Sequence, residues 1–224
     1  MYQLVSNIDE GILYFSKWLQ KELQSYPNPS NYSELNLCGN ENIVKIFRKE
    51  EELAEHFNFI KKESIPISVS ILQKGEYEYL YDASSAFKEL DIKVFNNGEE
   101  DILFKGKSAR YKSPISLNIV ARSLFSCKTL AFYISTILSS LKLLKYPAHI
   151  RKDGENVSTL TDYCSMKLNI ENPSMFSENP VVEGYYRLSL EFSFTDSYLF
   201  FKEVEEEEEN LSLTVIMRLR SNDT

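Results

Sequence analysis

Residues 112–141, KSPISLNIVARSLFSCKTLAFYISTILSSL, change their hydrophobic period halfway through. Apolar residues first alternate, at Ile115, Leu117 and Ile119, which predicts a strand with one buried face. After Arg122 they recur every three or four residues, which predicts an amphipathic helix. Because neither glycine nor proline separates the two periods, the strand is expected to lead directly into the helix.

The predicted helix spans about residues 124–145, and its apolar stripe consists of Cys127, Leu130, Ala131, Ile134, Ile137, Leu138 and Leu141. Ser123 or Ser126 can cap its N-terminus, and Tyr146-Pro147 is expected to end it before a return strand. A fully buried large apolar side chain contributes roughly 1.5–3 kcal/mol, so this stripe is expected to form a principal part of the core.

The rest of the chain is mostly patterned as strands. The 14 tyrosines and 14 phenylalanines favour a sheet. A second helix is expected at residues 7–25, ended by Pro27 and Pro29. Hairpins are expected at Asn97-Gly98 and Asp153-Gly154, and alternating strands at 65–72, 163–170, 186–194 and 211–219. The predicted fold class is α+β, with a mixed, mainly antiparallel sheet packed by the long helix and the N-terminal helix.

We expect one α+β domain over residues 1–224, because no linker or repeat divides the chain. Residues 30–64 are less regular and are interpreted as a peripheral insertion. Within them we expect strands near Leu35 and Leu37 and at 43–47, followed by a charged helix. Residues 200–212 are interpreted as an acidic loop.

Composition argues against several classes of function. The net charge of −8 disfavours a broad nucleic acid-binding surface, although an acidic channel that nucleic acid passes through is compatible with it. The three cysteines, Cys38, Cys127 and Cys164, form no CxxC pair and are interpreted as reduced, buried thiols. No stretch has the length and hydrophobicity of a membrane span. We therefore expect a soluble protein that is made in the cytoplasm.

The sequence contains no recognisable catalytic pattern, and we expect neither an enzyme nor a cofactor. His56 and His149 lack spaced partners, so they are interpreted as ordinary surface or boundary residues rather than as metal ligands. No phosphate-binding glycine loop and no hydrolase nucleophile elbow is present. The glutamate run, Glu205, Glu206, Glu207, Glu208 and Glu209, is either a solvated loop or an acidic contact surface or pore lining.

Two stretches together resemble the tail-completion, or tail terminator, proteins of phages, among them the neck and tail sheath stabiliser proteins of contractile tails. Residues 110–150 match as a strand led in by a basic residue and Pro114, ending at Arg122, then a helix and a further strand. Residues 178–201 match as Glu183-Gly184, then Arg187, then a long aromatic strand.

The resemblance implies a structural virion protein in the tail or neck. It forms a homo-hexameric ring that ends the tail tube, caps the sheath where there is one, and docks to the head-side connector, while DNA passes through without specific binding. No catalytic residue, metal, cofactor or membrane belongs to such a ring. The interface or lumen residues expected on this basis are Arg110, Arg122, Arg187 and the five glutamates Glu205 to Glu209.

The mode of assembly is a separate hypothesis. Strand edges between residues 65–104 and 186–219 are expected to stay open and to pair across subunits, as edge strands can. Two alternatives remain at this stage. One is another baseplate or head–tail connector component, and the other is a non-viral adaptor that presents an edge strand to peptides.

Overall fold

The computed structural model describes residues 2–6, 8–28, 31, 33–38, 43–74, 78–79, 88–95, 102–141, 143–169, 175–182, 184–203 and 214–218. The helical elements are α1 (Ile8–Gln24), the short 3₁₀ helix η1 (Ser33–Leu35), α2 (Glu50–Lys62) and α3 (Leu124–Ser140). The strands are β1 (Tyr2–Ser6), β2 (Val44–Phe47), β3 (Ile67–Gln73), β4 (Glu78–Tyr79), β5 (Lys88–Phe95), β6 (Ile102–Ala121), β7 (Leu144–Lys152), β8 (Glu155–Asn169), β9 (Met175–Val182), β10 (Tyr185–Glu203) and β11 (Thr214–Arg218).

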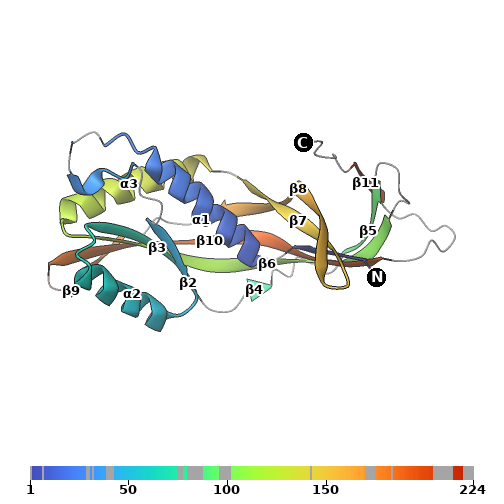
Figure 1. The fold of residues 1–224 in the computed structure, drawn as a ribbon, viewed down its shortest axis with the longest axis horizontal. Coiled ribbons are helices and arrows are strands. Elements are labelled where there is room, and N and C mark those ends of the chain that lie inside the picture. The colour runs from blue at the N-terminus through green and yellow to red at the C-terminus, as the bar shows by residue number, and fades with distance from the viewer. Residues whose placement is uncertain are drawn as a thin grey trace.

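Within the described residues all eleven strands belong to one sheet, centred on the antiparallel pair β6–β10 (Figure 1). The pairing runs from Tyr186 opposite Ala121 to Glu203 opposite Phe104. Two pairs are parallel, β2 with β3 and β11 with β5, and the others are antiparallel. The α+β class with a mixed, mainly antiparallel sheet is thereby confirmed.

Helices cover both faces of this sheet. Helices α1 and α3 lie on one side and α2 lies on the other (Figure 1). The main core fills the α1/α3 side, where Ile115, Leu117 and Ile119 of β6 are fully buried. A smaller core on the α2 side joins Leu53 and Phe57 of that helix to the sheet. No helix among the described residues is both long and apolar enough to cross a membrane.

The strand-to-helix unit forms as the sequence predicts. Strand β6 ends at Ala121, and Ser123 caps α3 by accepting a hydrogen bond from the backbone N–H of Ser126 at 3.4 Å. Leu130, Ile134 and Leu138 are buried in the main core. The return strand β7 pairs with β8.

The predicted end of this helix is wrong. Helix α3 stops at Ser140, because Leu141 already has an extended backbone, and β7 begins at Leu144. Pro147 therefore lies inside a strand. The β7–β8 register shifts between Tyr146 and Ala148, and such a bulge tolerates a residue that has no N–H to donate.

Both predicted hairpins have their arms paired as expected. Lys152 pairs with Glu155 around Asp153-Gly154, and both turn residues have positive φ, 51° and 93°, which suits a two-residue turn. Val94 pairs with Ile102 in the other hairpin, and its Asn97-Gly98 turn lies outside the described residues.

The expectation of open edges is wrong for β3 and β10. Strand β3 lies between β2 and β6, and β10 pairs with β6 on one side and with β9, β8 and β1 in succession on the other. Strand β1, which the sequence did not predict, pairs with both β7 and β10 and so closes this part of the sheet on itself. Hydrogen bonds along these two strands are satisfied within one chain.

Residues 30–64 contribute to both cores where they are described. Leu35, Leu37 and Ile43 are buried in the main core, and β2 extends the sheet beside β3. The strand expected near Leu35 and Leu37 is wrong, since η1 ends at Leu35. The interpretation of this segment as an insertion into a single domain stays a prediction.

Candidate functional site

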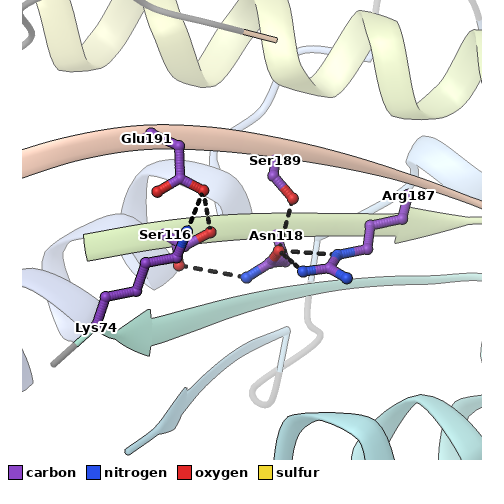
Figure 2. Close-up of polar contacts among 6 residues, drawn as sticks. All are labelled: Lys74, Ser116, Asn118, Arg187, Ser189 and Glu191. Atoms are coloured by element: carbon purple, nitrogen blue, oxygen red, sulfur yellow. Dashed lines mark hydrogen bonds and ion pairs between the residues drawn. The ribbon is translucent and has the colours of Figure 1, made fainter. Parts of the chain in front are cut away.

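The α2 side of the sheet carries a connected set of polar side chains centred on Asn118 of β6 (Figure 2). Its Oδ1 atom accepts hydrogen bonds from Nε and Nη2 of Arg187, at 2.9 and 2.6 Å, and from Oγ of Ser189 at 2.7 Å. Its Nδ2 atom donates to the carbonyl oxygen of Ser116 at 3.3 Å. Asn118 is completely buried, so these contacts replace the water that its amide loses on folding.

A second branch of the network begins at Ser116, two residues earlier on the same strand. Ser116 Oγ donates to Oε1 of Glu191 at 2.7 Å, and Lys74 Nζ forms an ion pair with the same oxygen at 2.9 Å (Figure 2). The pair joins the end of β3 to β10. Because Lys74 and Glu191 are both partly exposed, this branch lies at the rim of the network.

The arginine of the network also contacts α2. The guanidinium carbon of Arg187 lies 5.1 Å from the ring centre of Phe57, within the range of a cation–π interaction. Arg187 therefore links β6, its own strand β10 and the helix. Such a planar fork can serve several acceptors and an aromatic face at once, which a lysine at the same position could not reproduce.

A groove of about 860 Å³ opens between α2 and the sheet beside this network. Leu53, Phe57 and Leu72 give it an apolar floor. Its polar and small lining residues are Glu50, Glu51, Ala54, Lys74, Arg187, Ser189 and Glu191. The volume is in the range of ligand pockets, and an apolar floor with a charged rim suits a side chain of another molecule as well.

The sequence-predicted arginines lie at different places. Arg122, just after β6, donates from Nη2 to the carbonyl oxygen of Ser64 at 2.8 Å and from Nε to Oη of Tyr185 at 3.3 Å. The hydrogen bond to Tyr185 is the main reason that the pKa of Arg122 is raised. Arg122 thus fastens the end of α2 to the sheet.

The structure brings Arg122 and Arg187 to the same α2-facing end of the β6–β10 pair. Arg110 pairs with Ser197 twelve residues back along β6, about 40 Å from Arg122 at the rise of a strand. Its side chain lies outside the described residues, as do Glu205, Glu206, Glu207, Glu208 and Glu209 in full. Whether these six residues line an interface or a lumen stays a prediction.

The two histidines are held by side-chain contacts. His56 is buried, which corrects its interpretation as a surface or boundary residue, and its Nε2 lies 3.1 Å from Oγ of Ser68. Burial, with a smaller effect of Lys45, lowers the pKa of His56 to about 4. His149 Nε2 lies 3.3 Å from Oε1 of Glu10. Within the described ranges, no cluster of three metal-ligating side chains occurs.

The three cysteine thiols differ in burial. Cys127 and Cys164 are buried as predicted, but Cys38 is exposed, which corrects that part of the prediction. Burial raises the pKa of Cys127 to about 12, so its thiol stays protonated and unreactive at neutral pH.

Sequence reasoning missed Asn118, Ser189, Glu191 and Lys74 as members of one network. The alternation of β6 places Asn118 opposite the apolar face, where a polar residue is usually solvated. The one signal available was an asparagine in the middle of a strand, a residue type that strands disfavour. The geometry as a whole is suited to binding and to holding elements together.

Comparisons with known proteins leave the question of function to the structure. No protein-family model matches this chain, and a search of curated proteins finds no significant relative.

Proposed function

We propose that this chain is a structural component of a phage tail. It forms a ring at the head-proximal end, terminates the tube, caps the sheath in a contractile tail and docks to the head-side connector. The sequence resemblance supports this proposal, because its two stretches coincide with β6–α3–β7 and with the end of β9 and most of β10. These are the elements that make up the centre of the fold.

The observation that carries the proposal is the length of the β6–β10 pair. Its Ala121 end lies between the helices, whereas its Phe104 end continues past them, together with β5, β1 and β11, into an extended arm (Figure 1). In the proposed ring, this arm is the part of the sheet that extends toward neighbouring subunits. Long shared surfaces of this kind are typical of obligate assemblies.

The surroundings of the described polar network also favour a structural role. Its arginine, asparagine and serines bond to one another, and its lysine is paired with a glutamate. General acid–base catalysis needs a group with its proton poised near neutral pH, and His56 is held neutral in the core. The net charge of −8 supports passage of DNA through the ring without adhesion.

The edge-strand adaptor is a weaker alternative. Strands β3, β5 and β10, which were among those expected to offer edges, are paired on both sides, whereas β11 pairs only with β5 among the described residues. At the short edge strand β2, the backbone N–H of Val44 donates to Oε1 of Gln20 at 2.9 Å. A peptide adding to this edge would have to displace that bond.

The proposal is tested by electron microscopy of purified protein and of phage tails from its source, with antibody labelling and mass photometry. We expect six-fold rings or a labelled disc at the head-proximal end of the tail. If the antibody labels the baseplate end instead, the protein is another virion component and not the tail terminator. A monomer absent from every particle would overturn the proposal in favour of the adaptor.

A further inference from the structure

Helix α3 presents an unusual outer face. Phe132 is 71% exposed and Phe125 is 49% exposed, although both lie on a helix whose other side fills the main core. The two residues are seven positions apart, so they lie on one side of the helix, with Lys128 between them. This set of Phe125, Lys128 and Phe132 is called the α3 patch below.

The charge of this layer contrasts with that of the chain. The exposed charged side chains described on α1 and α3 are Lys17, Lys21 and Lys128, while Glu10 and Glu22 of α1 are half-buried. The chain as a whole is acidic, with a net charge of −8. Two exposed phenylalanines with one cation, Lys128, between them therefore face outward on this side of the sheet. Phenylalanine is enriched in the buried centres of protein–protein interfaces.

The opposite side of the same molecule carries the complementary features. The first turns of α2 expose Glu50, Glu51, Glu52 and Glu55, and two of these, Glu50 and Glu51, line the groove of about 860 Å³. The groove floor consists of Leu53, Phe57 and Leu72. The α2 edge of the groove is therefore acidic at Glu50 and Glu51, whereas its opposite edge carries Arg187 and Lys74, the latter paired with Glu191.

We propose that the α3 patch of one copy of this chain docks into the α2 groove of the next copy. Phe132 enters the hollow over Leu53, Phe57 and Leu72, and Lys128 lies beside Glu50 and Glu51. This inference rests on the proposed ring function and names the contact between its subunits. A second copy is the partner because Lys128 of the patch is opposite in charge to Glu50 and Glu51 of the groove, and both surfaces are apolar beside these charges.

The geometry also selects the kind of contact. The patch and the groove lie on opposite sides of the sheet, as α3 and α2 do in Figure 1. A contact between two different surfaces of one chain is head-to-tail, and repeated contacts of this type give a ring when the rotation closes. Pairing of two α3 patches would instead bring two copies of Lys128 together. Since β3 and β10 are paired on both sides within the chain, side-chain docking offers a contact that needs no free edge of these two strands.

Site-directed cross-linking tests the contact in full-length protein. In a Cys38→Ser background, one chain carries Thr136→Cys, one turn from Phe132, and a second carries Ala54→Cys at the groove. We expect a bis-maleimide linker to join the two chains. The matched control replaces the first site with Val157→Cys, exposed on β8, and we expect no product. Equal linking in both pairs, or none between positions 136 and 54, would overturn the docking.

Charge exchange gives an independent readout. Lys128→Glu should reduce the 136–54 product roughly tenfold, which corresponds to about 1.4 kcal/mol of contact energy. Combining it with Glu50→Lys and Glu51→Lys in the partner chain should restore the product. Lys145→Glu, the same charge change at an exposed position of β7, should leave it unchanged. Failure of the exchange to restore linking would contradict the proposed pairing.

The outcomes separate this inference from the ring itself. Six-fold rings without the 136–54 product mean that the ring stands and the docking is wrong. If the 136–54 product forms but microscopy shows open filaments of subunits, the docking stands and the closed ring is wrong. Phe132→Ser should abolish the product without unfolding the chain, as circular dichroism would show, because this side chain is exposed in the single chain.

Discussion

The two faces of β6 show two ways of burying a strand. On the α1/α3 side, Ile115, Leu117 and Ile119 are fully buried among apolar side chains. On the α2 side, Ser116 and Asn118 are as deeply buried but are held by hydrogen bonds. The residues alternate along one strand, so the same backbone supports a dry core and a polar network.

The difference lies in what each face contributes. A buried large apolar side chain is worth roughly 1.5–3 kcal/mol, whereas a hydrogen bond exchanged for bonds to water contributes about 1 kcal/mol net. The α1/α3 face is therefore expected to supply most of the stability. The α2 face fixes the position of the helix and leaves the groove open, and this makes it the more suitable side for receiving a partner.

The largest loss of stability is expected from Leu117→Ala on the apolar α1/α3 face of β6, called the dry face below. Leu117 is fully buried, so its truncation leaves a cavity and should lower the free energy of unfolding by roughly 2–5 kcal/mol, measured by denaturant unfolding. Val157→Ala, at an exposed position of β8 outside the proposed contact, is the matched control, and its effect should stay within about 0.5 kcal/mol. Similar losses for both variants would mean that the dry face does not dominate.

A smaller loss is expected from Asn118→Ala on the polar face. Arg187 and Ser189 would lose their common acceptor, at a cost of about 2–3 kcal/mol. A double-mutant cycle with Arg187→Met should show a coupling energy of about 1 kcal/mol or more. Additive effects of the two substitutions would contradict the contact between them.

The polar face should also make stability depend on pH. Burial lowers the pKa of His56 from 6.5 to about 4, so the unfolded chain takes up a proton more readily than the folded chain between these values. Stability from this group is complete above pH 6.5 and falls as the pH drops toward 4. At pH 5 the loss should be about 2 kcal/mol relative to pH 8.

The matched variant for this prediction is His56→Gln. It removes the titrating group, so the difference in unfolding free energy between wild type and variant isolates His56 from the carboxyl groups. An unchanged pH slope in the variant would assign the dependence to other residues.

The smallest effect is expected at Ser70 of β3, on the same polar face. Its Oγ atom is buried and has no hydrogen-bond partner among the described residues. Ser70→Ala should therefore change stability by less than about 1 kcal/mol, in the stabilising direction. Ser68→Ala, which removes the contact with His56, should be destabilising by about 1 kcal/mol. Thermal melting of the two variants should therefore show shifts of opposite sign, and shifts of the same sign would contradict this prediction.

Much of the dry face could be predicted because its signal is local. The spacing of Leu130, Ile134 and Leu138, and the cap at Ser123, involve residues within one or two helical turns of each other. The same holds for the Asp153-Gly154 turn. Aspartate and glycine both tolerate positive φ, so the two residue types alone predict this turn. The sequence misplaces the end of this helix, because Pro147 predicts a helix terminus there. In the structure a bulge accommodates Pro147 in β7.

The polar face could not be predicted in the same way. Arg187 was singled out for its place in a sequence pattern, but its acceptor, Asn118, comes from a strand far away in the chain. Asn118 and a solvent-facing asparagine look alike in a sequence. Asn118 differs from a solvent-facing asparagine only because α2 packs over this side of the sheet.

The sequence by itself determined that a strand runs directly into a capped helix, that aromatic strands form a mixed sheet, and that the fold is α+β. Periodicity and capping act between near neighbours, so they can be read along the chain. Only the tertiary structure decided that the polar side of β6 is covered, that β1 closes the sheet through β7 and β10, and that the groove lies opposite the α3 patch. These features depend on which distant segments meet, and the free energy that selects those partners comes from packing of the whole chain.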